Sequence, residues 1–226
     1  MNVNEILSKK KYENNLSRSD FNESWLFEYP EQIIGDINAW PQIENDINEL
    51  INSIPDKVEN LNNGLKKMDF NNDVYYWIEN DKGEFIIGTS LDKKPYALFV
   101  GMTGKNKKFR NVPPYGSDLY LAILNDLKGT KCNLIISDKT ITQYGYKIWE
   151  KLFSLEHKVS LYDKNNPSGT YKKFNSLADL NKYFQVGKEF QNYRYILSEN
   201  QETMFSVYIG FKKRKYREEN NLGLED

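Results

Sequence analysis

The chain has 226 residues, with 31 Lys and Arg against 32 Asp and Glu, a net charge of −1, one Cys and one His. This length predicts one domain with a real core, and a single Cys132 and a single His157 exclude a disulfide framework, a cysteine zinc cluster and a histidine-pair metal site. No apolar run approaches the about 18 residues of a membrane span, and no apolar segment of a secretory signal is present, so we expect an intracellular protein that does not enter a membrane.

Two compositional biases concern the origin of the chain. It contains 26 Lys against 5 Arg, together with 27 Asn. Codons rich in A and T encode Lys and Asn, so this usage indicates an A/T-rich bacterial or phage genome. The near-zero net charge argues against a dedicated nucleic-acid-binding protein, because such domains usually carry a basic surface.

The N-terminal quarter is predicted to be a flexible arm followed by helix. Residues 1–24 are polar and without periodicity, and an aromatic cluster precedes Pro30, so we expect a flexible arm over 1–29. Over residues 31–54 the apolar side chains recur every three or four positions, which predicts one helix, or two helices broken near Pro41.

The pattern then changes to the period of two that is typical of strands. Residues 73–79 and 84–91 are predicted to form a hairpin, because Gly83 can adopt the left-handed conformation of the turn between them. Residues 96–102 read as a third strand, and 60–70 contain another. This region is therefore expected to be an antiparallel meander.

The second half alternates between helices and strands. Residues 116–127 are predicted to be a helix with Ser117 or Asp118 available to cap it, and 133–137 a buried strand. Residues 140–155 read as an amphipathic helix. Its expected buried stripe is Ile141, Tyr144, Ile148, Trp149, Leu152 and Leu155.

Further short elements complete the order. Strands are expected at residues 158–162, 171–174 and 193–197, with a helix that Ser176 caps and that runs to Phe184. The fold class is therefore α+β, with a mixed, mainly antiparallel sheet flanked by helices. We expect a single domain over 30–211 and a charged C-terminal tail over 212–226.

Two stretches invite comparison with phosphate-binding loops. Gly-Met-Thr-Gly-Lys at 101–105 fails the P-loop pattern at Phe99 and Asn106, so a turn at the end of a strand is the preferred interpretation. Residues 105–116 are basic and lead into a helix N-terminus, whose free N–H groups would suit a phosphate. The alternative is that the basic side chains only solvate a long loop.

Three other features have ordinary explanations. Asp138 follows a buried strand, where ligands often bind, but Asp138 or Thr140 capping the next helix is the preferred interpretation. His157 is interpreted as a surface-turn residue because no nucleophile lies near it in the sequence. The basic residues of the tail would be solvated, and they are a weak signal for nucleic acid; they are Lys212, Lys213, Arg214, Lys215 and Arg217.

The order of elements resembles that of the GNAT N-acetyltransferase fold. The likeness is greatest over residues 96–163, where YALFVGM stands for the central strand, PPYGSDLY for the pyrophosphate-binding loop and IWEKL for the end of a family helix. The resemblance implies a GNAT-like domain. If acyl-CoA is bound, it implies contacts from Lys105, Lys107, Arg110, Tyr115, Gly116 and Ser117.

The sequence departs from the family pattern at two places. The family's loop carries Gln/Arg-x-x-Gly-x-Gly/Ala, whereas this chain keeps only Gly116 and continues with Ser117 and Asp118, whose charge would oppose an anion. Trp149 stands where the family often has a Tyr as general acid, and an indole N–H is far too weak an acid for that role.

Several phrases, among them ESWLFEYP, GYKIWEKL and YRYILSEN, also look like an uncharacterised family of bacteriophage proteins. Together the resemblances favour a phage-encoded, GNAT-like protein that needs no cofactor. It would act by binding a phage or host protein, as a virion-associated or accessory protein in the host cytoplasm or the virion. The alternatives are an active transferase that uses acetyl-CoA, and a host-directed inhibitor.

Overall fold

The computed structural model describes residues 40–94, 97–130, 132–138, 141, 143–155, 159–163, 172–183 and 193–198. The predicted arm over 1–29, the predicted tail over 212–226, Thr140 and His157 lie outside the described residues. Within the described part of the chain, no helix is both long enough and apolar enough to span a bilayer.

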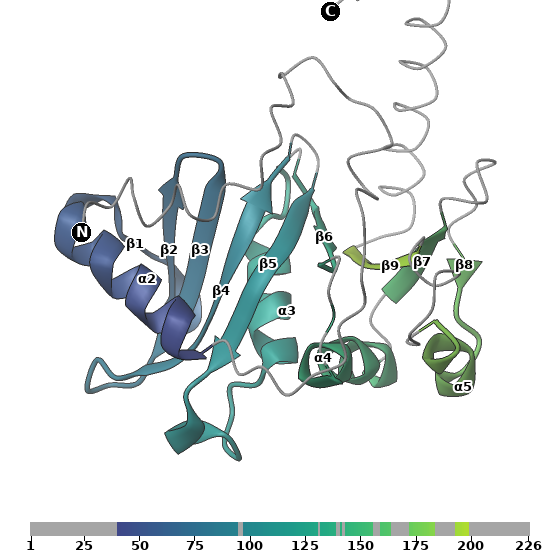
Figure 1. Ribbon diagram of the computed structural model, residues 1–226. Coiled ribbons are helices and arrows are strands. Elements are labelled where there is room, and N and C mark those ends of the chain that lie inside the picture. Colours follow the sequence, from purple (N-terminus) through teal and green to yellow (C-terminus); the bar gives the residue numbers. More distant parts are fainter. Residues whose placement is uncertain are drawn as a thin grey trace, which may run out of the picture.

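A single sheet organises the described residues, as the sequence predicts. Its strand order is β1-β2-β3-β4-β5-β6-β9-β7-β8, with one parallel neighbour pair, β5 and β6. The α+β class, with a mixed and mainly antiparallel sheet flanked by helices, is thereby confirmed (Figure 1). The strands are β1 (Glu59–Asn60), β2 (Leu65–Phe70), β3 (Asp73–Glu79), β4 (Phe85–Lys93), β5 (Leu98–Lys105), β6 (Leu134–Ile136), β7 (Val159–Asp163), β8 (Lys172–Lys173) and β9 (Tyr193–Ser198).

The first five strands form the expected antiparallel meander. The turn between β3 and β4 places Gly83 at φ +75°, a conformation that favours glycine because it has no β-carbon. The Asn80 side chain accepts hydrogen bonds from the backbone N–H groups of Lys82 and Glu84, at 3.0 and 2.9 Å, and so stabilises the turn.

The prediction of a strand-end turn at residues 101–105 is wrong, because β5 continues through Lys105. The pairing between β4 and β5 shifts register at Ser90 and Leu91, so that Gly101 is the extra residue of a bulge. A β-carbon at Gly101 would lie 3.3 Å from both the carbonyl oxygen and the hydroxyl of Ser90. Glycine therefore serves the close pairing of two strands here.

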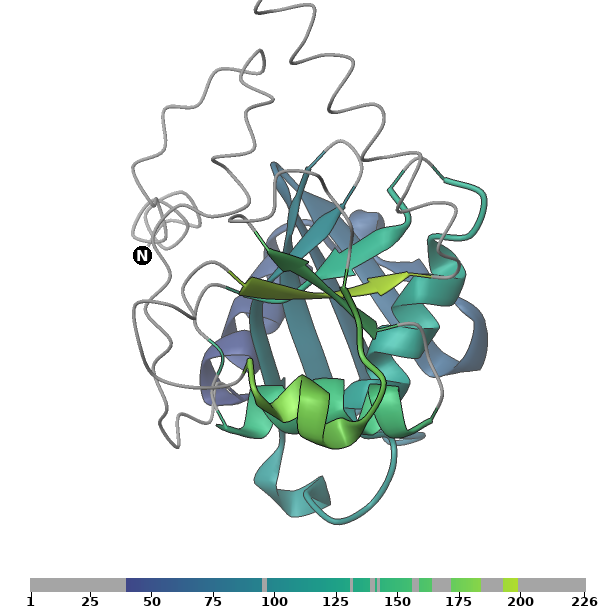
Figure 2. The same ribbon diagram turned by 90° about the vertical axis from the view of Figure 1, so that its right-hand side faces the viewer.

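The second part of the sheet begins with β6. It pairs with β5 over only two residues, Leu98 with Ile135 and Phe99 with Ile136, and no other described strand pairs with β5 on that side. On its other edge β6 pairs with β9, and β9 in turn pairs with β7, both antiparallel. The sheet twists so strongly that β9 runs across the direction of β4 and β5 (Figure 2).

Helices cover both faces of the sheet. Helix α2 (Trp40–Ser53) lies on one face and buries Ile43, Ile47 and Leu50 against residues of β2, β3 and β4. The other face carries α3 (Gly116–Asp126), α4 (Gln143–Ser154) and α5 (Leu177–Asn181), which share one larger core (Figures 1 and 2). Short 3₁₀ turns occur at η2 (Pro55–Lys57), η3 (Asn62–Gly64) and η4 (Lys107–Phe109).

The helix ends agree with the sequence in part. Pro41 lies in the first turn of α2, where proline is tolerated. The Ser176 hydroxyl accepts a hydrogen bond from the N–H of Asp179 at 3.1 Å and caps α5 as predicted. Helix α4 starts at Gln143, so Asp138 lies too far upstream to cap it, while Thr140, the other predicted cap, lies outside the described residues.

The buried face of α4 differs from the predicted one. Tyr144 and Leu155 were expected in the core, yet each is 42% exposed. Trp149 and Leu152 are buried as expected, and Tyr146 joins them. The core contacts therefore centre on the line Tyr146–Trp149–Leu152, which leaves Tyr144 at the surface.

Candidate functional site

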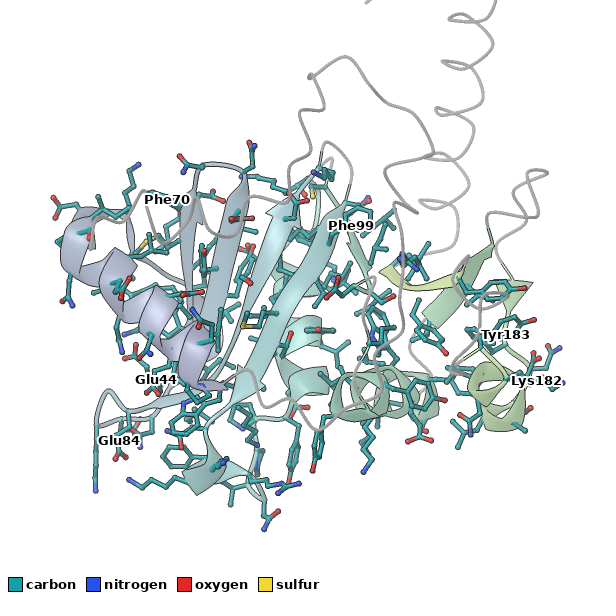
Figure 3. All side chains as sticks on the ribbon, viewed as in Figure 1. Glu44, Phe70, Glu84, Phe99, Lys182 and Tyr183 are labelled. Atoms are coloured by element: carbon teal, nitrogen blue, oxygen red, sulfur yellow. The ribbon has the colours of Figure 1, made fainter. Side chains whose placement is uncertain are left out.

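The residues that the sequence assigned to cofactor binding lie along one loop. It leaves the end of β5 at Lys105, passes through η4, and enters α3 at Gly116. The loop projects beyond the end of the sheet beside which α4 lies (Figure 1). Glu84, in the turn before β4, lies at the same end of the sheet and pairs with Lys108 of the loop (Figure 3).

The ammonium group of Lys105 is engaged within the loop. It donates a hydrogen bond to the carbonyl oxygen of Val112 and lies 4.3 Å from the centroid of the Tyr115 ring. Partial burial lowers the pKa of Lys105, and the charge of Asp118 acts in the opposite direction. The Lys105 ammonium, which would have to pair with a bound phosphate, therefore stabilises the loop instead.

Arg110 joins the loop to α4. Its Nη2 donates to the hydroxyl of Tyr144 at 2.5 Å, and its guanidinium carbon lies 5.2 Å from the Tyr144 ring centroid. Lys147 approaches the same ring to 5.7 Å. Lys107, by contrast, is exposed in η4. Of the predicted cations, Lys105 therefore lies beside the start of α3, whereas Arg110 is directed toward α4.

Gly116 has a packing role at the helix start. A β-carbon at this position would lie 2.4 Å from Cδ1 and 2.7 Å from Cγ1 of Ile148. The absence of a side chain therefore lets α3 approach α4, and Ile148 takes the space through which a phosphate would reach the backbone. Ser117, the next predicted contact, is only 2% exposed.

A carboxylate of the chain itself, that of Asp118, lies at the N-terminus of α3. The carboxylate of Asp118 accepts a hydrogen bond from the N–H of Tyr115 at 2.7 Å, which satisfies one of the donors that a helix start leaves open. Asp118 thus serves the helix end as predicted. Its negative charge at the positive end of the helix dipole takes the role that a pyrophosphate would have.

Aromatic residues of α3, α4 and β9 pack on one another in the core. The Tyr120 hydroxyl hydrogen-bonds to that of Thr103 on β5 at 2.9 Å, and its ring meets Trp149 edge to face with centroids 5.8 Å apart. Trp149 stacks on Tyr195 of β9, also at 5.8 Å. Tyr120, Trp149 and Tyr195 are each only 2% exposed, so the predicted packing role of Trp149 is confirmed.

No group in this cluster is tuned for proton transfer at neutral pH. Burial raises the pKa values of Tyr120 and Tyr195 well above the ordinary value for a phenol. Burial lowers the pKa of Arg194 to about 10, and the charge of Asp138 acts against that shift. Asp138 therefore compensates a buried guanidinium at the end of β6.

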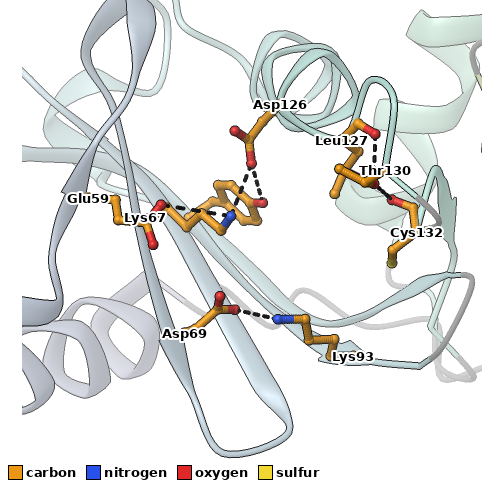
Figure 4. A network of polar contacts seen from close by, with 9 residues as sticks. Glu59, Lys67, Asp69, Lys93, Asp126, Leu127, Thr130 and Cys132 are labelled. Carbon is orange, nitrogen blue, oxygen red and sulfur yellow. Dashed lines mark hydrogen bonds and ion pairs between the residues drawn. The ribbon is translucent and has the colours of Figure 1, made fainter.

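A second polar cluster lies at the far end of α3 (Figure 4). The Asp126 carboxylate accepts from the Tyr76 hydroxyl at 2.8 Å and pairs with Lys67 at 3.4 Å. Nearby, Cys132 donates its thiol to the carbonyl of Lys94 at 3.7 Å, and burial raises its pKa to about 11. These contacts tie α3 to β2 and β3, and the Cys132 thiol is not poised as a nucleophile.

The described side chains provide neither a metal site nor a fitting site for a pyrophosphate. Among the described residues, no three His, Cys, Asp or Glu side chains gather in a way that could hold a metal ion. The residues at the start of α3 do not fit a pyrophosphate, since Ile148 covers Gly116 and Asp118 presents a negative charge there.

Sequence reasoning missed the surface that these contacts create. We define the Arg110 patch as the exposed area formed by Lys105, Arg110, Val112, Tyr115, Tyr144 and Lys147. Val112, Tyr115 and Tyr144 are 47%, 43% and 42% exposed. Tyr144 was assigned to the core, and its partner Arg110 lies 34 residues away, so no local spacing could have indicated the patch.

The chain was compared with family models, curated proteins and solved structures. No family model and no curated protein match this chain. Among solved structures it is similar to a protein of Bacteroides thetaiotaomicron assigned to the GNAT acetyltransferase family, with 13% identity, covering 80% of this chain and 94% of the other. The TM-score of that match is 0.34.

Proposed function

We propose that this chain is a phage-encoded, GNAT-like protein that lacks acyl-CoA chemistry and acts by binding a protein partner. It would work in the host cytoplasm or in the virion, as a virion-associated or accessory protein. The order of elements and the A/T-rich composition support this proposal. The observation that carries it is the contact between Gly116 and Ile148, because it closes the helix start at which a pyrophosphate would bind.

Two further features support a binding role over catalysis. The predicted cofactor cations Lys105 and Arg110 already contact Val112 and Tyr144 within the protein. A cofactor would have to replace the Lys105 contact before it gained the charge of that ammonium, and the bond to Tyr144 directs Arg110 toward α4. In addition, Trp149 stands at the position of the family's general acid and is packed between two tyrosine rings.

One observation favours the alternative of an active acyl-CoA-dependent transferase. Strands β5 and β6 pair over only two residues, so β5 beyond Phe99 has no hydrogen-bonded neighbour on the β6 side among the described residues. In this alternative, that edge would orient a thioester, and the backbone at the start of α3 would hold the pyrophosphate. A host-directed inhibitor is a second alternative, whose expected contact regions, the arm and the tail, lie outside the described residues.

Acetyl-CoA binding separates the proposal from the transferase. The full chain is heated with and without millimolar acetyl-CoA, and acetyl-CoA consumption is followed in parallel; we expect no change in Tm and no consumption. A rise in Tm of several degrees would contradict the proposal if Lys105→Ala/Arg110→Ala abolishes it. The matched control is Lys57→Ala/Lys82→Ala, which removes two exposed lysines elsewhere.

A further inference from the structure

Exposed apolar side chains gather at the Arg110 patch. Among the described residues, the large hydrophobic side chains that are exposed are Val112, Tyr115, Tyr144, Leu155 and Leu177. The first three all belong to the Arg110 patch. Single exposed apolar residues need no explanation, whereas a group of them on one surface is typical of an interaction site.

The patch is held in place by its own contacts. Arg110 bonds to Tyr144 on α4, so the loop after η4 cannot move independently of the helix without breaking a 2.5 Å hydrogen bond. At the other end of the patch, the Tyr115 hydroxyl donates to the carbonyl of Asn111 at 3.1 Å, beneath the ammonium of Lys105. Because these side chains are ordered before binding, the entropic cost of binding a partner is smaller.

The charge of the patch has one sign. Lys105, Arg110 and Lys147 supply cations around the aromatic rings. The adjoining carboxylate of Asp118 is directed to the N–H of Tyr115. The chain as a whole carries a net charge of −1, so this local excess of positive charge is not a property of the entire surface.

We propose that the Arg110 patch binds an acidic segment of a partner protein. This inference rests on the proposed function, since it names the partner's chemistry for a protein that acts by binding. Carboxylates of the segment would pair with Arg110 and Lys147, whose side chains are exposed. Apolar side chains of the segment would cover Val112 and the parts of the two tyrosine side chains that the cations leave exposed.

An acidic protein segment fits the patch better than a nucleic acid does. A base stacks on an open aromatic face, but Lys105 lies over the Tyr115 ring and Arg110 over that of Tyr144. A nucleic acid also presents a long, uniform negative charge to a chain whose net charge is −1. A short acidic segment needs only the local cations.

The test uses the full chain and a fluorescein-labelled peptide of alternating glutamate and leucine, with fluorescence anisotropy as the readout. Two matched probes are a peptide in which lysine replaces glutamate and a thymidine oligonucleotide of the same length. We expect the glutamate peptide to bind best, and its Kd to rise with salt. Arg110→Ala/Lys147→Ala should weaken binding about tenfold or more, while the exposed-lysine control Lys57→Ala/Lys82→Ala leaves it unchanged.

The other outcomes overturn the inference. It fails if the glutamate peptide does not bind, or if both double variants weaken binding equally, and it fails if the oligonucleotide binds more tightly through Arg110 and Lys147. Thermal unfolding of each variant checks that the fold is retained. We expect unchanged Tm values, because the four substituted side chains are exposed. Stabilisation by acetyl-CoA would contradict the proposed function separately, whatever the peptide does.

Discussion

Ile148 lies directly against Gly116, so that a β-carbon at residue 116 would come within 2.4 Å of Ile148 Cδ1. The two residues belong to the start of α3 and the middle of α4, and their contact sets how closely the helices approach. A glycine at a helix start near a basic loop is typical of phosphate binding, but here its neighbour is an aliphatic side chain. The contact with Ile148 therefore indicates that Gly116 serves helix packing rather than phosphate binding.

Gly116→Ala is expected to destabilise the protein by about 1–3 kcal/mol, because the added methyl group overpacks the contact with Ile148. Denaturant unfolding measures the effect. The matched variant Gly116→Ala/Ile148→Ala provides the space, so it should lose less stability than the two single substitutions together. Strict additivity in this cycle would show that the two side chains do not meet.

Trp149→Ala is expected to lower the free energy of unfolding by about 3–5 kcal/mol, since it removes a large ring packed between Tyr120 and Tyr195. Trp149→Tyr should cost less and should not create acetyl transfer. Denaturant midpoints and an acetyl-CoA consumption assay check both points. The control is Tyr144→Ala on the same helix, which is exposed and should change stability by about 0.5 kcal/mol or less.

Tyr120→Phe removes the hydroxyl that hydrogen-bonds to Thr103 at 2.9 Å in the core. We expect a loss of about 0.5–1.5 kcal/mol, the usual net worth of such a bond. Tyr115→Phe is the matched control, because its hydroxyl bonds to Asn111 at the surface. Equal effects of the two substitutions on the denaturant midpoint would contradict the buried role of the Tyr120 hydroxyl.

Alkaline pH is expected to destabilise the fold through its buried tyrosines. Burial raises the pKa values of Tyr75, Tyr76, Tyr120, Tyr146 and Tyr195 above the ordinary value of 10.0. In the unfolded chain these phenols ionise near pH 10, whereas in the folded protein they keep their protons. The folded state then binds more protons, so the free energy of unfolding falls as the pH rises through 10, and below that pH these groups add no pH dependence.

Tyrosinate absorbance in the near ultraviolet, followed with circular dichroism, checks this expectation. The buried tyrosines should ionise only as the fold is lost, so their absorbance change and the loss of native dichroism should occur over the same pH range. Complete ionisation of all tyrosines in a protein that keeps its native dichroism would mean that the phenols are accessible.

Local patterns were enough to predict much of the fold. Strand β3 has the predicted bounds, because its run of β-branched and aromatic residues favours a strand and the Asn80–Gly83 turn signal marks its end. Helix α3 begins at the predicted Gly116 for a similar reason, since Asp118 can satisfy the helix start. In both cases the decisive contacts join residues within a few positions of one another.

The predictions were wrong where residues far apart in the sequence determine burial or strand pairing. Tyr144 and Tyr146 are equally amphipathic, and hydropathy alone cannot tell which one is buried. The choice is made by Tyr195 of β9, which packs on Tyr146 with ring centroids 5.9 Å apart, and by Arg110, which bonds to Tyr144 at the surface. The same holds for Gly101, whose opposing residue Ser90 belongs to another strand.

The position of β9 between β6 and β7 has a consequence for the order in which the chain can fold during synthesis. Strands β2 to β5 pair with their neighbours in sequence, so each hairpin can close as soon as it leaves the ribosome. Strands β6 and β7, however, have no hydrogen bonds to each other and wait for β9, which ends at Ser198. A chain halted before residue 193 would present two unpaired strand edges, so the later half of the sheet becomes a target for chaperones or aggregation until its last strand arrives.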